Sequence, residues 1–364
     1  MTGLLPEGFD DRLPPFADVA ARVERRMLDT AHGYGYEQVD PPLAEYEDEL
    51  ARRLKEGGAR GAVRFVDPLS QRNLAIRPDI TAQIGRIAAT RMGHHPRPLR
   101  LSYAGPVLKL RGSELRPARA MRQIGFELIG RDSVAAAREV VAVAVEALAA
   151  AGVAGVSVDF TLPDLVPTLA ESWPDARLTE LRDALDAKDA GRVAAIDPAY
   201  LPLIEAAGPF DRAIARLRAH DTGGALASRI DGLVAIAGAL PGGVTLTLDP
   251  TERHGFEYQS WFGFSLFAAG LSGEIGRGGS YVVLGADGSE EAAVGVSLYP
   301  DALVDATAVR PERRRLFLPM GTPADVGARL RGEGWVTVTA LEDEDTPAAQ
   351  LCTHVWRDGA ASPA

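Results

Sequence analysis

The chain has 364 residues, of which 46% are hydrophobic and 24% are charged, and its formal net charge at pH 7 is −11. This length and composition predict a globular protein with one large core and a smaller appendage. The acidic total argues against nucleic acid as a partner, because proteins that bind polyanions carry a basic surface. The single cysteine, Cys352, excludes a disulfide within the chain and a metal cluster built on paired cysteines.

The sequence contains no pattern typical of a targeting signal, a membrane span or a metal site. The opening residues, MTGLLPEGFDDRLP, lack a basic segment followed by an apolar run, and no stretch approaches ~20 uninterrupted apolar residues. His94 and His95 are adjacent and so project in different directions, with no suitably spaced third ligand. We therefore expect a cytoplasmic protein that has no membrane contact, no bound metal and no cofactor.

The first third of the chain predicts alternating helices and strands. Apolar residues recur at helical spacing from Phe16 onward, and Gly33 and Gly35 end that helix. A short strand follows and is broken by Pro41 and Pro42. The expected elements are a helix over 16–32, a strand over 36–39, a charged helix over 43–61, paired strands over 64–67 and 73–76, and a helix over 80–91.

Residues 99–130 predict a hairpin that faces a ligand. Its first strand spans 99–110 and its second spans 121–129, joined by a basic connection rich in Arg and Gly. Because side chains alternate along a strand, Gln123 and Glu127 share one face with Gly125 between them. That face predicts a shallow floor where a small polar molecule could lie against the backbone. A solvated sheet face is the alternative interpretation.

The remaining segments extend this α+β pattern around a sheet that we expect to be antiparallel. A helix over 133–151 and a strand over 156–160 precede an insertion of short helices over 163–240, rich in Ala, Leu, Arg and Asp. Strand-like segments return at 243–249, 255–268, 274–281 and 292–303. In the tail, Thr322 is expected to cap a helix between two strands, followed by a helix or strand around 351–356. We predict a core over 1–310 and a small α/β unit over 311–364.

Residues 65–130 resemble the catalytic core of class II histidyl-tRNA synthetases. In that family a strand ending in Arg-Pro-Glu and a strand carrying Gln-x-Gly-x-Glu hold the amino acid histidine. Here Arg77-Pro78-Asp79 matches the first pattern, and Gln123 with Glu127 matches the second. The order of helix, Gly-Tyr turn, strand and proline over 16–42 resembles the unit that forms the dimer interface of the family. The resemblance covers about residues 5–305.

Several positions depart from the synthetase pattern where the family carries charged groups for amino acid activation. The Phe-Arg-x-Glu positions hold Leu108, Lys109, Leu110 and Arg111. The lysine ammonium is a point charge where the family has a forked guanidinium, and a basic side chain replaces the family's glutamate. Ala302 aligns with an adenine-binding arginine, and Pro300 is expected to break the helix that would start there. The other substituted positions are His254, Gln259, Ser280 and Val282. The pattern predicts that the amino acid site is kept while activation chemistry is lost.

This combination resembles the regulatory subunits of short-form ATP phosphoribosyltransferase, which look like a synthetase core without an anticodon-binding domain. The resemblance implies a non-catalytic subunit that supports the short-form ATP phosphoribosyltransferase catalytic subunit in the first step of histidine biosynthesis. It further implies feedback inhibition by L-histidine as effector, and a homodimer formed through the N-terminal helix and strand. The alternatives are a truncated histidyl-tRNA synthetase or other amino acid adenylating enzyme, and a nucleic-acid-binding paralogue.

The candidate histidine-binding residues follow from the same resemblance. Asp79, Gln123 and Glu127 are expected to bind the ammonium group, since charge-assisted hydrogen bonds to carboxylates are strong. Competing interpretations are that Asp79 caps the helix near Thr81, and that Glu127 forms an ion pair with Arg119 or Arg122. The substitutions at Gln259, Ser280 and Val282 leave open that histidine affinity is lost and only an assembly role survives. The expected pocket neighbours are Tyr103, Arg119 and Tyr258, the last of which could instead be core.

Overall fold

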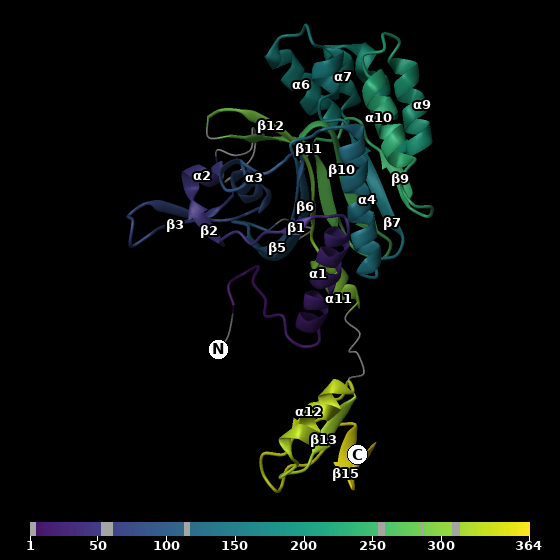
Figure 1. Cartoon of the computed structure of the whole chain (residues 1–364). Coiled ribbons are helices and arrows are strands. Elements are labelled where there is room, and N and C mark those ends of the chain that lie inside the picture. The colour runs from purple at the N-terminus through teal and green to yellow at the C-terminus, as the bar shows by residue number, and fades with distance from the viewer. Residues whose placement is uncertain (1–4, 52–60, 113–116, 254–258, 286, 308–313) are drawn as a thin grey trace. The chain divides into compact units, whose positions relative to one another are not determined.

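A computed structural model describes residues 5–51, 61–112, 117–253, 259–285, 287–307 and 314–364. The chain divides into two compact units, Met1–Ala308 and Val309–Ala364. Among the described residues, every helix is too short or too polar to cross a membrane. Figure 1 shows the helices and strands of the two units.

The larger unit is built on one central sheet, which has nine strands within the described residues. Neighbouring strands are antiparallel except for β1 with β5 and β7 with β9, which are parallel. The α+β prediction is therefore confirmed, with parallel pairings added near the two ends of the sheet. In spatial order the strands are β1 (Glu37–Gln38), β5 (Leu99–Leu108), β6 (Ala120–Ile129), β12 (Glu290–Leu298), β11 (Gly276–Leu284), β10 (Gln259–Ala268), β7 (Val156–Thr161), β9 (Thr245–Leu248) and β8 (Gly208–Pro209).

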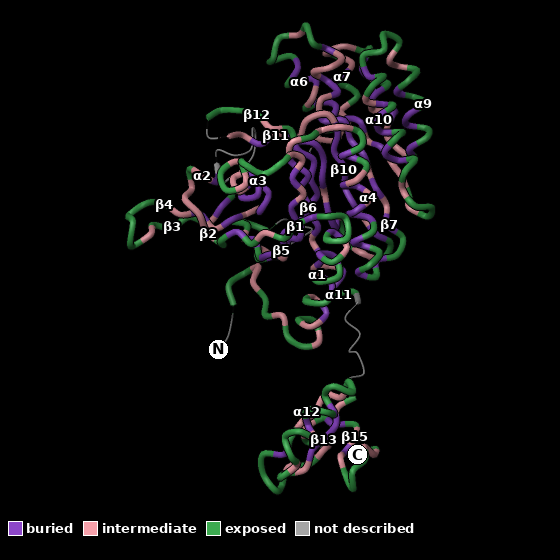
Figure 2. The backbone as a smooth tube through the Cα atoms, in the orientation of Figure 1, coloured by how far each residue is buried: buried purple, intermediate pink, exposed green. Residues whose placement is uncertain are grey.

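One face of this sheet is apolar and is covered by helices. Alternate residues of the central strands, such as Phe126, Val296 and Phe264, belong to the same buried cluster as the helices packed on them. Ser133 caps the main covering helix by accepting a hydrogen bond from the Ala136 amide at 3.2 Å. The tube in Figure 2 shows these central strands as largely buried. The covering helices are α1 (Phe16–Gly33), α4 (Val134–Ala150) and α10 (Ala227–Ala237).

The opposite face of the central strands carries polar side chains and receives a smaller layer. This layer is a three-stranded sheet together with two helices, and its apolar residues Ile80 and Ile84 pack against Val283 and Tyr281 of the central sheet. The face that carries Gln123 and Glu127 is therefore only partly covered. The elements of the layer are β2 (Ala44–Tyr46), α2 (Glu47–Ala51), β3 (Val63–Val66), β4 (Asn73–Ile76) and α3 (Thr81–Thr90).

The helix predicted over 43–61 is wrong in its first residues. Ala44–Tyr46 forms a strand that pairs antiparallel with β4, and helix α2 begins only at Glu47. The Arg72 guanidinium lies 3.5 Å from the centre of the Tyr46 ring, which stabilises this strand arrangement. Strand pairing at the second sheet therefore outweighs the helical preference of the charged segment. Residues 52–60 lie outside the described residues.

The insertion is helical as predicted, except for β8, which extends the central sheet beside β9. After β12, helix α11 (Asp301–Thr307) starts directly behind Pro300, whose carbonyl accepts a hydrogen bond from the Val304 amide at 2.9 Å. The expected break at Pro300 is wrong, because the first turn of a helix needs no amide hydrogen from that residue. The insertion consists of α5 (Leu165–Leu169), α6 (Asp175–Asp186), α7 (Ala190–Ile196), a 3₁₀ turn (Pro198–Tyr200), α8 (Leu201–Glu205), α9 (Phe210–His220) and α10.

The smaller unit forms its own sheet in the order β14-β13-β15-β16, with a strand–helix–strand crossover as predicted. Thr322 does not cap the helix: its hydroxyl donates to the Pro319 carbonyl at 2.6 Å, and the helix begins two residues later behind Pro323. The segment around 351–356 ends in a strand. The elements are β13 (Arg315–Leu318), α12 (Ala324–Gly332), β14 (Val336–Thr339), β15 (His354–Arg357) and β16 (Ala360–Pro363).

The packing of β6 against the covering helices predicts a large cost for Phe126→Ala. Phe126 is fully buried, and its ring meets the ring of Tyr36 edge to face at a centroid distance of 6.1 Å. Truncation leaves a cavity and should lower the free energy of unfolding by ~3–5 kcal/mol in urea denaturation. Leu69→Ala, at a side chain that is 92% exposed, should change it by less than ~0.5 kcal/mol. Equal stability of the two variants would contradict this packing.

Candidate functional site

Four of the six predicted site residues lie together on the polar face of the central sheet. Gln123 and Glu127 project from β6, Tyr103 projects from β5, and Asp79 lies just before α3. Tyr103 is the register partner of Gly125, so its side chain stands between those of Gln123 and Glu127. The hairpin predicted from the sequence therefore brings these residues together.

The Gln123 side chain links the start of α3 to the sheet. Its Oε1 accepts from the Ile80 amide at 2.9 Å, and its Nε2 donates to Asp79 Oδ2 at 2.9 Å and to Ser297 Oγ at 2.7 Å. Both amide hydrogens are thus used within the protein. Gln123 holds Asp79 in place, which makes it a positioning residue for the carboxylate.

The Asp79 carboxylate bonds at the start of α3, as the alternative interpretation expected, and its role in ligand binding stays a prediction. Its Oδ1 accepts from the backbone amide of Thr81 at 2.7 Å, at the start of α3, while its Oδ2 accepts from Gln123. Each carboxylate oxygen has a second lone pair, so this arrangement leaves acceptor capacity for a ligand's N–H group. The side chain is half-buried, in contrast to the fully buried Gln123 and Glu127.

The Glu127 carboxyl is buried and is held by tyrosine hydroxyls. Tyr103 donates to Oε1 at 3.0 Å and Tyr281 donates to Oε2 at 2.7 Å. Burial raises the pKa of Glu127 to about 8, and the charge of Asp79 adds to this rise, although the two tyrosine hydrogen bonds oppose it. The competing interpretation, an ion pair of Glu127 with Arg119 or Arg122, is wrong, because Arg122 bonds to Glu24 and Arg119 donates to the Lys109 carbonyl. At neutral pH the cluster therefore holds a carboxylic acid that can also donate a hydrogen bond.

Glycines make room for these polar groups on the polar face of the central sheet. A Cβ added to Gly125 would collide with the Tyr103 hydroxyl, and one added to Gly295 would collide with Glu127 Oε2. The open floor expected at Gly125 is therefore filled by Tyr103. Glycine at these two positions is required by close approach of a side chain from a neighbouring strand.

The sequence did not single out three further members of the cluster. The Thr81 hydroxyl lies 3.1 Å from that of Tyr103, Ser297 bonds to Gln123, and Tyr281 bonds to Glu127. Thr81 could have been found from its position two residues after Asp79 in the Arg-Pro-Asp-x-Thr run. Tyr281 lies on β11 and Ser297 lies on β12. No local sequence pattern shows how these two strands align with β6.

Two predicted neighbours do not belong to the described cluster. Arg119 lies at the start of β6, where its Nε donates to the Lys109 carbonyl at 3.3 Å and its guanidinium stacks over Phe9 at 5.0 Å. Tyr258 lies outside the described residues. The same holds for His254, one of the substituted positions.

Three positions that depart from the synthetase pattern, Lys109, Ser280 and Ala302, lie in different surroundings. The Lys109 ammonium lies 5.9 Å from the centre of the Tyr299 ring. Ser280 is fully buried, and its Oγ accepts from the Ser260 hydroxyl at 2.8 Å and from the Trp261 amide at 3.1 Å. Ala302 is in the first turn of α11. Across the described residues, no group of three or more His, Cys, Asp or Glu side chains could hold a metal ion.

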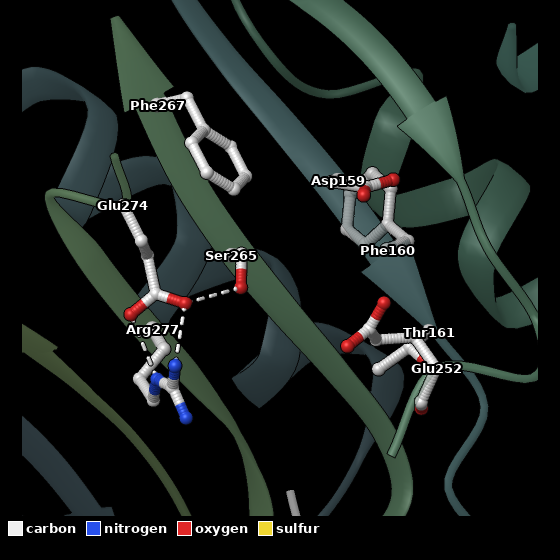
Figure 3. A pocket seen from close by; sticks show the side chains of 8 residues that line it. All are labelled: Asp159, Phe160, Thr161, Glu252, Ser265, Phe267, Glu274 and Arg277. Atoms are coloured by element: carbon white, nitrogen blue, oxygen red, sulfur yellow. Dashed lines mark hydrogen bonds and ion pairs between the residues drawn. The ribbon is translucent and has the colours of Figure 1, made fainter. Parts of the chain in front are cut away.

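A separate pocket of about 210 Å³ lies further along the same face, over β11, β10 and β7. In Figure 3, Glu274 accepts hydrogen bonds from Ser265 and Arg277 on one side, while Glu252 and Asp159 lie on the other. Burial, followed by the charges of Asp249 and Asp186, raises the pKa of Glu252. The pocket adjoins the cluster through β11 and β12, where Arg277 is the register partner of Ser297.

The fold and the cluster together define a class II synthetase-like protein with a buried polar cluster on its central sheet. The sequence profile of the histidyl-tRNA synthetase family matches residues 8–303. The chain is 44% identical over 98% of its length, and 95% of the relative, to the "ATP phosphoribosyltransferase regulatory subunit" of Rhodospirillum centenum. It is 43% identical over 96% of its length, and 95% of the relative, to the protein of that name from Paramagnetospirillum magneticum.

A solved structure supports the same fold. The chain resembles an "ATP phosphoribosyltransferase regulatory subunit/histidyl-tRNA synthetase" from Bacillus halodurans with a TM-score of 0.82, at 20% identity and 96% coverage of both chains. The chain belongs to the ATP phosphoribosyltransferase regulatory subunits, a family with the histidyl-tRNA synthetase fold.

The raised pKa of Glu127 predicts a component of stability that depends on pH. The folded chain holds this proton up to a pKa of about 8, whereas the unfolded chain releases it near the ordinary value of 4.5. Stability should therefore fall as pH rises from about 5 to 8, by up to a few kcal/mol. Glu127→Gln imitates the protonated carboxyl and should flatten this dependence in urea denaturation at pH 5, 7 and 9. Glu171→Gln, at an exposed glutamate, should show the same pH dependence of stability as the wild type. If the stability of Glu127→Gln changed with pH in parallel with that of the wild type, the raised pKa of Glu127 would be contradicted.

The close approach of Glu127 to Gly295 predicts that an added methyl group is not tolerated. Gly295→Ala should displace the Glu127 carboxyl from Tyr281 and lower the free energy of unfolding by ~1–3 kcal/mol. Gly242→Ala is the matched control, because a Cβ there meets no atom within 4 Å. Chemical denaturation measures both variants, and equal stability would show that Glu127 does not occupy this space.

Proposed function

We propose that this chain is a non-catalytic regulatory subunit that binds free L-histidine at the Asp79–Gln123–Glu127 cluster. In this proposal it supports the catalytic subunit of a short-form ATP phosphoribosyltransferase and transmits feedback inhibition by histidine. The names of its relatives, at 43–44% identity, describe regulatory subunits of that enzyme. A location in the cytoplasm stays a prediction.

The observation that carries the proposal is a hydrogen-bonded acidic cluster in a chain that departs from the synthetase pattern at the positions of amino acid activation. Asp79, fixed by Gln123 and the Thr81 amide, offers carboxylate oxygens to an ammonium group. Glu127 and its two tyrosines offer donors and acceptors to the rest of the ligand. Adenylate formation would require cations held against a triphosphate, and the arginine positions of the synthetase pattern hold Lys109, Ser280 and Ala302 instead.

Feedback inhibition requires only a modest energetic preference. Histidine must bind one arrangement of the assembly more tightly than the other, and a difference of ~1–3 kcal/mol is typical of such coupling. Because such coupling is reciprocal, the catalytic partner would change the affinity of this chain for histidine by the same factor by which histidine changes the affinity for the partner. The chain needs no chemistry of its own for this role.

The proposed homodimer uses α1 and β1. Strand β1 is the first strand in the spatial order of the central sheet and pairs with β5 on one side. Its residues Glu37 and Gln38 are exposed. An edge strand presents unpaired backbone groups that a second copy can cover. Sedimentation of the purified chain tests this, and a monomer at micromolar concentration would contradict it.

The histidine site is tested by calorimetric titration of L-histidine into the full chain and into Asp79→Asn. Loss of the carboxylate charge removes a charge-assisted hydrogen bond to the ammonium and should weaken binding by ~1.5–3 kcal/mol, or more than tenfold. Asp287→Asn is the matched control, since Asp287 also accepts from a backbone amide two residues ahead but is fully exposed. Equal affinity in Asp79→Asn would place the ligand elsewhere.

The absence of catalysis is tested in parallel with the regulatory role. The purified chain should show no exchange of pyrophosphate into ATP in the presence of histidine. Together with its catalytic partner it should confer histidine inhibition, which Asp79→Asn should relieve while leaving the activity without histidine unchanged. Pyrophosphate exchange by the wild type would instead support a truncated synthetase or another adenylating enzyme.

A further inference from the structure

The pocket over β10 has no part in the proposed function. Ser265 lies between its register partners Asp159 on β7 and Arg277 on β11, and these three side chains point from the same face of the sheet. Figure 3 shows Glu274 and Arg277 on one side of Ser265, and Asp159 and Glu252 on the other. The two groups therefore form the walls of one cavity of about 210 Å³.

The wall formed by Glu274 and Arg277 is compensated within the protein. Arg277 donates from Nε to Oε1 of Glu274 and from Nη2 to Oε2, each at 2.7 Å. The Ser265 hydroxyl donates to the same Oε2 at 2.9 Å. A bidentate pair of this kind fixes the geometry of both charged groups. This wall therefore has no need of a charged ligand.

The opposite wall carries two carboxyl groups that form no ion pair within the described residues. Asp159 Oδ1 accepts a hydrogen bond from the Thr247 hydroxyl at 2.7 Å. The carboxyl of Glu252 accepts none within the part of the chain that the structure describes. The Lys188 ammonium acts on both carboxyls through its charge, but it bonds to Asp249 at 2.6 Å. The acids of this wall therefore lack a bonded cation.

The protonation of both carboxyls reflects this lack. Burial raises the pKa of Asp159 and of Glu252, and the charge of Asp249 adds to the rise in both. Asp186 and Asp159 raise the pKa of Glu252 further, whereas the charge of Lys188 lowers both values. A cation within ~4–6 Å would favour the ionised carboxylates. A positive charge in the cavity would thus relieve the repulsion between these acids.

The lining of the cavity limits the kind of cation that fits. Across the described residues, no group of three or more His, Cys, Asp or Glu side chains is arranged to hold a metal ion, so the cation is organic. Phe267 follows Ser265 by two residues on β10 and presents its ring to the cavity (Figure 3). A volume of about 210 Å³ is below the ~300–1,000 Å³ of sites for drug-sized molecules. The ligand is therefore small and carries a short apolar part.

We propose that this pocket is a second ligand site, for a small aliphatic amine, whose ammonium group lies between the carboxylates of Asp159 and Glu252 while its hydrocarbon chain packs on Phe267. An ammonium group donates three hydrogen bonds and accepts none, which suits a wall built of acceptors. Hydrogen bonds between an ammonium and a carboxylate are among the strong ones. The inference does not rest on histidine binding at the Asp79–Gln123–Glu127 cluster.

The test is calorimetric titration of the full chain with n-butylamine and with n-butanol, which has the same length and no charge. The wild type should bind the amine at one site per chain, about tenfold or more tightly than the alcohol. Glu252→Gln and Asp159→Asn should each weaken amine binding by about tenfold, because each removes one charge-assisted hydrogen bond. Both variants should fold, since burial already disfavours the ionised forms, and circular dichroism checks this.

Two control variants separate this pocket from other acids of the chain. Glu180→Gln removes the same charge at an exposed glutamate outside the pocket and should leave amine binding unchanged. Asp79→Asn should also leave it unchanged, because Asp79 belongs to the other cluster. Equal binding of amine and alcohol by the wild type, no saturable binding of the amine, or full affinity in Glu252→Gln and Asp159→Asn would each overturn the proposal.

The failure of this inference is distinct from the failure of the proposed function. If Asp79→Asn abolishes amine binding while Glu252→Gln retains it, the amine occupies the histidine cluster and the second site is overturned. Titration of L-histidine into Glu252→Gln should give the wild-type affinity. A loss of histidine binding in that variant would also overturn the inference, because the two sites would then be one.

Discussion

Burial of the Glu127 carboxyl is the constraint on which the rest of the site depends. An ionised carboxylate in an apolar interior is costly unless a cation or several donors compensate for it. Here two tyrosine hydroxyls supply the donors, and the remaining cost raises the pKa of the group to about 8. The site therefore stores a proton where a surface glutamate would carry a charge, and it requires hydroxyl-bearing side chains from both sides of β6.

This requirement fixes the register of four strands. Tyr103 reaches Glu127 from β5, and Tyr281 reaches it from β11 across the space left by Gly295 on β12. A slip of one residue in β6 would turn Glu127 toward α4 and bring Phe126 to the ligand-bearing face. The apolar packing of one face thus determines the polar arrangement of the other.

Features set by local periodicity could be predicted from the sequence. Alternation along β6 placed Gln123 and Glu127 on one face, and the helices α1, α3 and α4 follow apolar spacing with recognisable ends. The strand at Ala44–Tyr46 could not be predicted in this way, because its charged sequence favours a helix and only its pairing with β4 makes it a strand. The predicted helix cap at Thr322 is wrong for a similar reason, because its hydroxyl donates to the Pro319 carbonyl in the preceding turn.

The members of the site that prediction missed come from distant parts of the chain. Tyr281 is 154 residues from Glu127, and Ser297 is 174 residues from Gln123. A single sequence contains no periodicity that aligns such strands, whereas the family resemblance supplied Asp79 after β4 and the two residues on β6 directly. It could not show that Tyr103 fills the space above Gly125, because that depends on a side-chain orientation across two strands.

The retained acids and the substituted cations occupy structurally independent positions, which explains how one set can change without the other. Gln123 and Glu127 lie within β6 and are fully buried in the network that joins α3 to the sheet. Lys109 and Arg111 lie beyond the end of β5, outside the paired strands, so substitution there disturbs no strand pairing. Ser280 points to the opposite face and bonds to the backbone of β10, where a charged side chain would have to enter the apolar core. Substitution at Lys109 and Arg111 therefore costs little stability, whereas loss of Glu127 or Gln123 would leave buried donors unpaired. Packing alone therefore favours keeping the cluster.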